Sequence, residues 1–106
     1  MALEFKKKYD DVKKRWEIAL RGEIDISTVQ SLKETLEEAF RERESDISLV
    51  LSDLEYIDST GLGAIIGANG RMKEKGKDIV LIKPSATLKK LLAITSLNKV
   101  FVIEED

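Results

Sequence analysis

Apolar residues recur at two different spacings along the chain, and each spacing predicts one kind of element. Residues 16–20 alternate between apolar and polar or small side chains, as do residues 3–9, and this period of two is typical of strands with one buried face. An acidic pair at residues 10–11 interrupts the alternation. The chain is therefore predicted to open with a β-hairpin, whose second strand ends at Gly22 before a loop over residues 22–25.

Three later segments carry apolar residues every three or four positions, which predicts amphipathic helices. The expected helices cover residues 27 to 42 or 43, with capping-box spacing from Ser27 to Gln30, residues 59 or 60 to about 75, ended by Gly76, and a segment that starts at Pro84 and Ser85. The side chains expected to face the core are Val29, Leu32, Leu36, Ala39 and Phe40 in the first helix, Leu62, Ile65, Ile66, Asn69 and Met72 in the second, and Leu88, Leu91 and Leu92 in the third.

Short apolar runs between the helices predict three more strands, at residues 47–51, 79–82 and 100–103. Residues 52–57 are expected to form a connection. The run at 79–82 has no alternation, so it is predicted to be buried on both faces. Strands that alternate with helices after an opening hairpin indicate one α/β domain over residues 1–106, with a mixed β-sheet.

Composition narrows the possible functions by what is missing. The 106 residues include no cysteine and no histidine, which excludes disulfides, thiol catalysis, zinc sites with nitrogen or sulfur ligands and a Ser-His-Asp triad. A net charge of −2 makes no case for nucleic acid or an anionic membrane, and the basic residues at 6–8 and 13–15 are predicted to lie on solvated faces of the hairpin. No apolar run approaches the ~20 residues of a membrane helix, and residues 1–4 do not resemble a signal peptide, so the protein is expected in the cytoplasm.

The segment from Tyr56 to Gly63 carries the most specific signal, because it places two hydroxyls where a helix follows a buried strand. Asp58, Ser59 and Thr60 are three residues that could each cap this helix. Ser59 is therefore either the cap or a group that another protein reaches and modifies. A phosphate on Ser59 would be tolerated by the fold, because the free N–H groups and the positive dipole end of a helix N-terminus stabilise anions.

Glycine is unusually frequent in the same helix, at positions 61, 63, 67 and 70. Glycine in a helix interior costs about 1 kcal/mol relative to alanine, so the last three together forfeit roughly 2–3 kcal/mol. Gly63 and Gly67 lie one turn apart and would allow another backbone to approach closely. That backbone could belong to this domain or to a partner.

Other chemical motifs are weaker. The glycines from Gly61 to Gly67 superficially resemble a dinucleotide fingerprint, but the spacing is wrong at the third glycine, and the chain contains no phosphate-binding GxxxxGK[ST] loop. A weak nucleotide-binding or hydrolysing activity thus has no motif support. Asp25, Asp53 and Asp58 could gather near Ser59, but loop acids are more often caps and turn residues than metal ligands.

The chain resembles a STAS domain, and specifically a bacterial anti-sigma factor antagonist. The resemblance covers nearly the whole length and rests on residues 22–25 (GEID), residues 56–63 (YIDSTGLG) and residues 91–97 (LLAITSL). It implies a mixed sheet with helices packed mainly on one face. Three positions depart from the family pattern: Asn69 and Gly70 replace bulkier residues, and Ser96 replaces a usual glycine.

The resemblance also implies a function without catalysis or a cofactor. The unphosphorylated protein would bind an anti-sigma factor that is itself a serine kinase, phosphorylation of Ser59 would dissociate the complex, and a serine phosphatase would reverse the modification. The expected partner-binding switch loop comprises Asp25, Asp58, Thr60, Gly61, Leu62 and Gly63. The alternative is a STAS module that serves as a scaffold or lipid-transport accessory, with Ser59 acting only as a cap.

Overall fold

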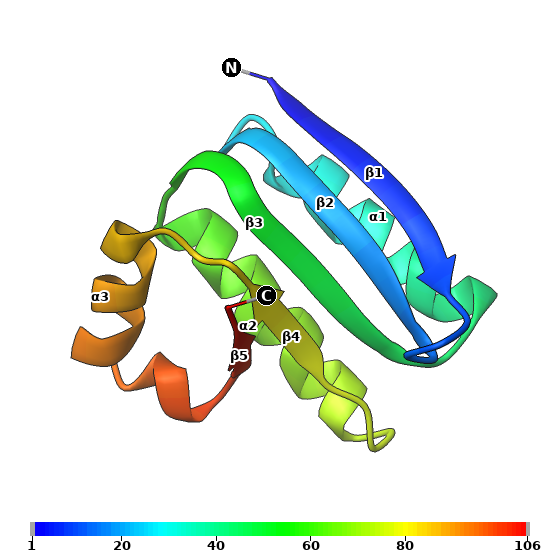
Figure 1. Cartoon of the computed structure of the whole chain (residues 1–106). Coiled ribbons are helices and arrows are strands. Elements are labelled where there is room, and N and C mark those ends of the chain that lie inside the picture. The colour runs from blue at the N-terminus through cyan, green and yellow to red at the C-terminus, as the bar shows by residue number, and fades with distance from the viewer. Residues whose placement is uncertain (1, 106) are drawn as a thin grey trace.

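Five strands form one mixed sheet in the order β1-β2-β3-β4-β5, seen from its open face in Figure 1. The structure is a computed structural model that describes residues 2–105. The elements are β1 (Leu3–Asp10), β2 (Arg15–Ile24), α1 (Val29–Glu42), β3 (Asp46–Ile57), α2 (Ser59–Lys73), β4 (Ile79–Ile82), α3 (Ala86–Ile94), the 3-10 turn η1 (Leu97–Lys99) and β5 (Val102–Glu104). This is the predicted order, and the predicted α/β class with a mixed sheet is confirmed.

Strand direction fixes where the functional segments meet. β1 pairs antiparallel with β2 through the hairpin, whereas β2, β3, β4 and β5 are parallel to one another. Parallel neighbours need a crossover, which α1, α2 and the α3–η1 segment supply. As a result, β2 and β3 end at the same edge of the sheet, where Ile24 pairs with Ile57.

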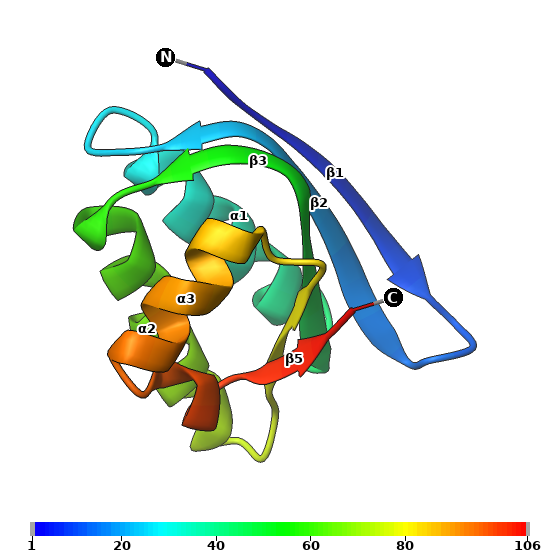
Figure 2. The ribbon, with the colours of Figure 1, turned by 60° about the vertical axis from the view of Figure 1, so that its left-hand side comes forward.

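The core lies between the sheet and the helices, which Figure 2 shows on one side of the strands. Ile18, Ile47 and Ile79 come from three neighbouring strands and are completely buried, and Leu32 of α1 meets them from the helix layer, also with no exposed surface. Burying each such side chain stabilises the fold by roughly 1.5–3 kcal/mol. Four of the predicted core-facing residues of α1 are buried, and the fifth, Phe40, is partly buried and packs against the core. Within residues 2–105, no helix combines the length and apolar character that crossing a membrane requires.

Two strands are longer than predicted. β2 continues through Gly22 to Ile24, and β3 includes residues 52–57, which were expected to be a connection. Gly22 has a φ of 114°, and a side chain there would collide with the Ala2 carbonyl oxygen. Two register shifts between β2 and β3 occur at residues 19–23 of β2. They allow the two strands to remain paired although the polar residues of this region interrupt the alternation of apolar and polar side chains.

The end of the chain also differs from its prediction. The last strand, β5, begins at Val102 rather than at residue 100, because Leu97–Lys99 first form a 3-10 turn. Ser96 ends α3 with a φ of 61°, in the left-handed region where glycine is usual. The third helix was expected to start at Pro84 and Ser85, but it begins at Ala86, and Ser85 is its N-cap, whose hydroxyl accepts the Leu88 N–H at 3.1 Å. Leu91 was expected to point inward, but its side chain is 38% exposed.

α2 is joined to β4 by a buried amide. Asn69 is 1% exposed, and its side-chain oxygen accepts the Ile79 N–H at 3.0 Å. This bond satisfies the first backbone donor of β4, and it explains why a polar residue lies on the buried stripe of α2. Gly76 turns the chain after α2 with a φ of 72°, as expected for a stop signal.

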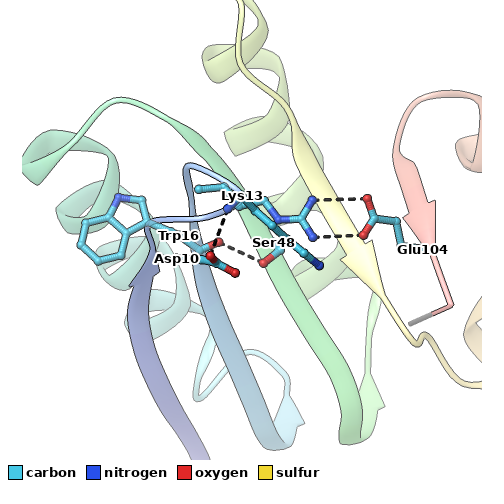
Figure 3. A network of polar contacts seen from close by, with 6 residues as sticks. Asp10, Lys13, Trp16, Ser48 and Glu104 are labelled. Atoms are coloured by element: carbon cyan, nitrogen blue, oxygen red, sulfur yellow. Dashed lines mark hydrogen bonds and ion pairs between the residues drawn. The ribbon is translucent and has the colours of Figure 1, made fainter.

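The hairpin turn and the last strand are fastened together across the open face of the sheet. Arg15 of β2 reaches over β3 and β4 and donates to both carboxylate oxygens of Glu104, at 3.0 and 3.3 Å (Figure 3). Beneath this pair, the Ser48 hydroxyl donates to the Trp16 carbonyl at 2.9 Å. The lysines at positions 6–8 are exposed as predicted, but the Arg15 side chain is only 11% exposed, so it is not part of a solvated basic face.

Candidate functional site

The predicted site lies at the sheet edge where β2 and β3 end and α2 begins. The Asp58 N–H donates to the Ile24 carbonyl at 3.1 Å, which holds the end of β3 against the end of β2. Asp25 directly follows Ile24, and Ser59 directly follows Asp58. The fold therefore brings the Asp25 loop and the serine segment to one edge, although the two aspartates are 33 positions apart in the sequence.

Asp58 is the N-cap of α2. Its backbone is extended, with φ −97° and ψ −178°, and its carboxylate accepts the Gly61 N–H at 2.9 Å. Its carbonyl accepts the Leu62 N–H at 3.0 Å, which closes the first turn. The sequence left open whether Asp58, Ser59 or Thr60 is the cap, and the geometry assigns this role to Asp58.

Ser59 is the first residue of α2, and its side chain is exposed. Within residues 2–105, its hydroxyl makes no hydrogen bond. The interpretation of Ser59 as a helix cap is therefore wrong. Thr60, the next residue, is also exposed. Two hydroxyls thus face solvent beside the cap, and neither is needed to form the helix.

The glycines of α2 differ in how closely other residues pack against them. A side chain at Gly61 would collide with Ile24 Cγ2 and would lie 3.0 Å from Ile57 Cγ1, so only glycine lets α2 start against the ends of β2 and β3. Leu62 is buried in the core behind it. A side chain at Gly63 or Gly70 would meet no atom within 4 Å. Close packing inside the described part of the domain therefore explains Gly61 but neither of these two glycines.

Gly67 is also free of tight contacts, since an added side chain there would meet only the flexible Arg71 guanidinium at 3.4 Å. Gly61, Gly63 and Gly67 all lie within the helix, so the glycines do not form the phosphate-cradling loop of a dinucleotide site. Together, Gly63, Gly67 and Gly70 form a stripe along α2 that carries no side chains.

Asp25 organises the loop before α1. Its carboxylate accepts the Ser27 N–H at 2.9 Å and the Ser27 hydroxyl at 2.6 Å, and this hydroxyl holds the pKa of Asp25 below its usual value. Thr28 is the N-cap residue of α1, but its hydroxyl donates to the Glu23 carbonyl at 2.9 Å and caps nothing. The predicted capping box from Ser27 to Gln30 does not form, because the Ser27 hydroxyl and the Ser27 N–H, which the box would use, both donate to the Asp25 carboxylate.

Acidic residues are frequent in the segments that lead to the serine edge of the sheet. Five carboxylates occupy the last parts of β2 and β3 and the residues that follow them: Glu23, Asp25, Asp53, Glu55 and Asp58. None of them forms an ion pair with a lysine or arginine of residues 2–105. Nor does the described part of the chain contain three acidic side chains arranged to hold a metal ion.

Two exposed apolar side chains flank the same edge, and the sequence interpretation did not assign them to the site. Ile26 is 76% exposed in the Asp25 loop, and Tyr56 is 52% exposed near the end of β3. The exposure of Ile26 could have been suspected from the sequence, because this isoleucine lies in a loop between two polar residues, Asp25 and Ser27. Exposure of Tyr56 could not be predicted, because it depends on the second register shift between β2 and β3.

Known proteins resemble this chain over most of its length. The anti-sigma-B factor antagonist of Staphylococcus aureus (strain NCTC 8325) is 30% identical over 92 residues, which are 87% of this chain and 85% of that protein. A candidate anti-sigma factor antagonist from Thermotoga maritima has a crystal structure with a TM-score of 0.87 and 25% identity, covering 96% of this chain and 86% of that one.

The anti-sigma factor antagonist SpoIIAA, in its unphosphorylated form, has a TM-score of 0.75 and 21% identity over 97% of this chain and 88% of that one, a likeness that shows the fold alone. SpoIIAA from Bacillus has also been solved in its phosphorylated form. A family model described as "Mlab, STAS domain" matches residues 8–104. The chain, with its mixed sheet and its serine at the start of α2, therefore belongs to the STAS domain family.

Proposed function

We propose that this protein is an anti-sigma factor antagonist controlled by phosphorylation of Ser59. The unphosphorylated form binds an anti-sigma factor with serine kinase activity, which frees the sigma factor, and the phosphorylated form does not bind. The observation that carries the proposal is the Ser59 hydroxyl, which is exposed at the start of α2 while Asp58 does the capping. The relatives named above as anti-sigma-B factor antagonists support it.

The switch needs no change of fold. The kinase transfers the γ-phosphoryl group of its ATP to Ser59 Oγ, releasing ADP and the hydroxyl proton, and a serine phosphatase hydrolyses the ester. A phosphoserine adds about −1.5 to −2 charges. Here that charge arrives beside Asp58 and Asp25 and opposite a kinase site that already holds nucleotide phosphates. Weakening the complex 100-fold requires only about 2.8 kcal/mol, which one desolvated and unpaired charge supplies.

The switch-loop residues divide into two groups in this proposal. Asp25, Thr60 and Gly63 offer exposed or partly exposed surface to the partner, whereas Gly61 and Leu62 are buried and hold Ser59 in place. Asp58 belongs to both groups, since it caps α2 and adds charge beside the serine. The protein acts as substrate and binding module in the cytoplasm and contributes no catalytic residue.

Two baits test the proposal directly. Ser59→Ala and Ser59→Asp are immobilised, incubated with a lysate of the native host and compared by mass spectrometry. We expect Ser59→Ala to retain a kinase-like protein that Ser59→Asp loses. Ser31→Asp is the control for an added charge, because Ser31 is an exposed serine on α1 that does not belong to the predicted switch loop. The purified kinase, given ATP, should then phosphorylate the wild type at Ser59 and leave Ser59→Ala unmodified.

A second candidate is a STAS module that acts as a scaffold or lipid-transport accessory without a phosphorylation switch. The description of the matching family model as an Mlab STAS domain favours it. In that case both Ser59 baits retain the same proteins, including a component of a membrane transporter in stoichiometric amount. Recovery of identical sets by the two baits would refute the phosphorylation switch.

A further inference from the structure

An apolar groove lies next to the serine segment, between β3 and α3. β4 pairs with β3 only from Ile47 to Val50, so no strand within residues 2–105 lies beside the last part of β3 on that side. α3 faces this part of β3 across a groove of about 290 Å³. Its walls include Leu54, Tyr56 and Ile57 from β3, and Leu88 and Leu91 from α3. We call this feature the β3–α3 groove.

The groove presents apolar surface that the described part of the chain leaves uncovered. Tyr56 is 52% and Leu91 38% exposed, although they lie on opposite walls of one depression. Leu88, deeper in the groove, is buried. A tyrosine and a leucine flanking an apolar depression form the kind of surface that receives an anchoring side chain of a partner, since aromatic residues dominate binding energy at interfaces.

A partner that holds Ser59 needs this kind of contact. A stable interface buries about 800 Å² on each protein, and its affinity comes from a few well-packed side chains. Ser59, Thr60 and Gly63 are small and provide little contact area. Tyr56 belongs to β3, only three residues before Ser59 at the start of α2, so a protein that encloses Ser59 is expected to cover the neighbouring groove as well.

The charge around the groove indicates the chemistry of the partner surface. Glu55 lines the groove, and Glu23 pairs with Tyr56 on the neighbouring strand. Among residues 2–105, neither carboxylate has an ion-pair partner. A docking surface that meets them is therefore expected to be basic, because like charges across an interface are costly and opposite charges speed association.

From the exposed apolar walls and the unpaired carboxylates beside them, we infer that the β3–α3 groove is the anchoring site for the anti-sigma factor. A basic surface of that protein inserts an apolar side chain between Tyr56 and Leu91. This inference rests on the proposed function and adds to it. Ser59 determines whether the complex forms, and the groove supplies most of its affinity. Phosphorylation then acts beside the anchor without altering it.

The test uses the kinase recovered with the Ser59→Ala bait, purified, and isothermal titration calorimetry with the full chain. Tyr56→Ala and Leu91→Ala should each weaken binding about tenfold, because each removes one wall of the groove. Tyr56→Phe should bind like the wild type, since it keeps the ring. Val12→Ala is the matched control, because Val12 is 90% exposed at the hairpin turn, at the other end of the sheet.

Two charge-reversal variants test the predicted basic character of the partner surface. Glu55→Lys should weaken binding and reduce its salt dependence, whereas Glu34→Lys, an equally exposed change on α1, should do neither. Circular dichroism of every variant establishes that it is folded. If Ser59→Asp loses the kinase but Tyr56→Ala and Leu91→Ala bind within about twofold of the wild type, the groove inference is overturned and the proposed function stands. If Ser59→Asp binds as tightly as the wild type, both fail together.

Discussion

The two ends of the sheet differ in how their side chains are engaged. We call the end at the β1–β2 turn (residues 10–15) the hairpin end, and the end where β2 and β3 stop and α2 starts (residues 23–26 and 55–60) the serine end. At the hairpin end, polar and aromatic side chains are engaged with one another. The Asp10 carboxylate accepts the N–H groups of Val12 and Lys13, and Arg15 is held by Glu104 (Figure 3). At the serine end, five carboxylates have no ion-pair partner among residues 2–105, and apolar side chains such as Ile26 are exposed.

Aromatic residues show the same contrast. Tyr9 packs edge-on against Trp16 at 5.4 Å between ring centroids, the Arg43 guanidinium lies 4.0 Å from the Tyr9 ring, and the Trp16 N–H donates to the Arg43 carbonyl at 3.1 Å. Tyr56, at the other end, is half exposed beside a groove. The hairpin end therefore stabilises the domain, while the serine end keeps surface available for a partner.

The largest expected effect on stability comes from Gly61→Ala. The new methyl group collides with Ile24 and Ile57, so we expect the free energy of unfolding to fall by about 1–3 kcal/mol. Gly63→Ala is the matched control and should instead raise it by about 0.5–1 kcal/mol, because nothing opposes the methyl group and alanine favours the helix. Urea unfolding followed by circular dichroism measures both. Equal effects of the two changes would contradict the division of the glycines described above.

Asp58→Ala is expected to have the next largest effect on stability. Compared with Ser59→Ala, it distinguishes the residue that stabilises α2 from the residue that is proposed to be phosphorylated. Loss of the cap should lower the free energy of unfolding by about 1 kcal/mol, within the usual range of about 0.5–2. Ser59→Ala should change it by less than about 0.5 kcal/mol, since its hydroxyl makes no bond within residues 2–105. Thermal unfolding of the two variants in parallel is sufficient. A larger loss in Ser59→Ala than in Asp58→Ala would restore Ser59 as the cap.

The smallest effect concerns the hairpin end and depends on pH. Hydrogen bonds from Arg15 lower the pKa of Glu104 below its ordinary value of 4.5. The resulting stability is present above about pH 4.5 and is lost as the pH falls through the lowered pKa, because protonation removes the carboxylate. Glu104→Gln should therefore cost about 1 kcal/mol or less at pH 7, and the difference from the wild type should shrink in acid.

Glu105→Gln is the control for that measurement, because the Lys89–Glu105 pair is more exposed. Glu104→Gln should not change binding of the kinase, since the Arg15–Glu104 pair fastens the hairpin end of the sheet. A loss of binding in Glu104→Gln would show that the two ends of the sheet are coupled, and it would end the simple contrast between them.

The order of the elements, the fold class and the segment that carries the candidate site could all be predicted from the amino-acid sequence. Hydrophobic periodicity was sufficient for α1 and for β4, because each buries a regular stripe or a continuous run of apolar residues. It failed at the ends of β2 and β3, where polar residues remain in strands that backbone pairing and register shifts hold together. Such pairing partners are distant in sequence and leave no local pattern.

The separate roles of Asp58, Ser59 and Thr60 became clear from the packing of the folded chain. Asp58, Ser59 and Thr60 are all competent caps, and the choice depends on where β3 ends against β2. Likewise, glycines that look equivalent in the sequence differ because Ile24 and Ile57 press on Gly61 and nothing presses on Gly63. Local capping preference identifies the residues that are able to cap α2. Packing against strands that are distant in sequence determines which of them is the cap and which hydroxyl remains free.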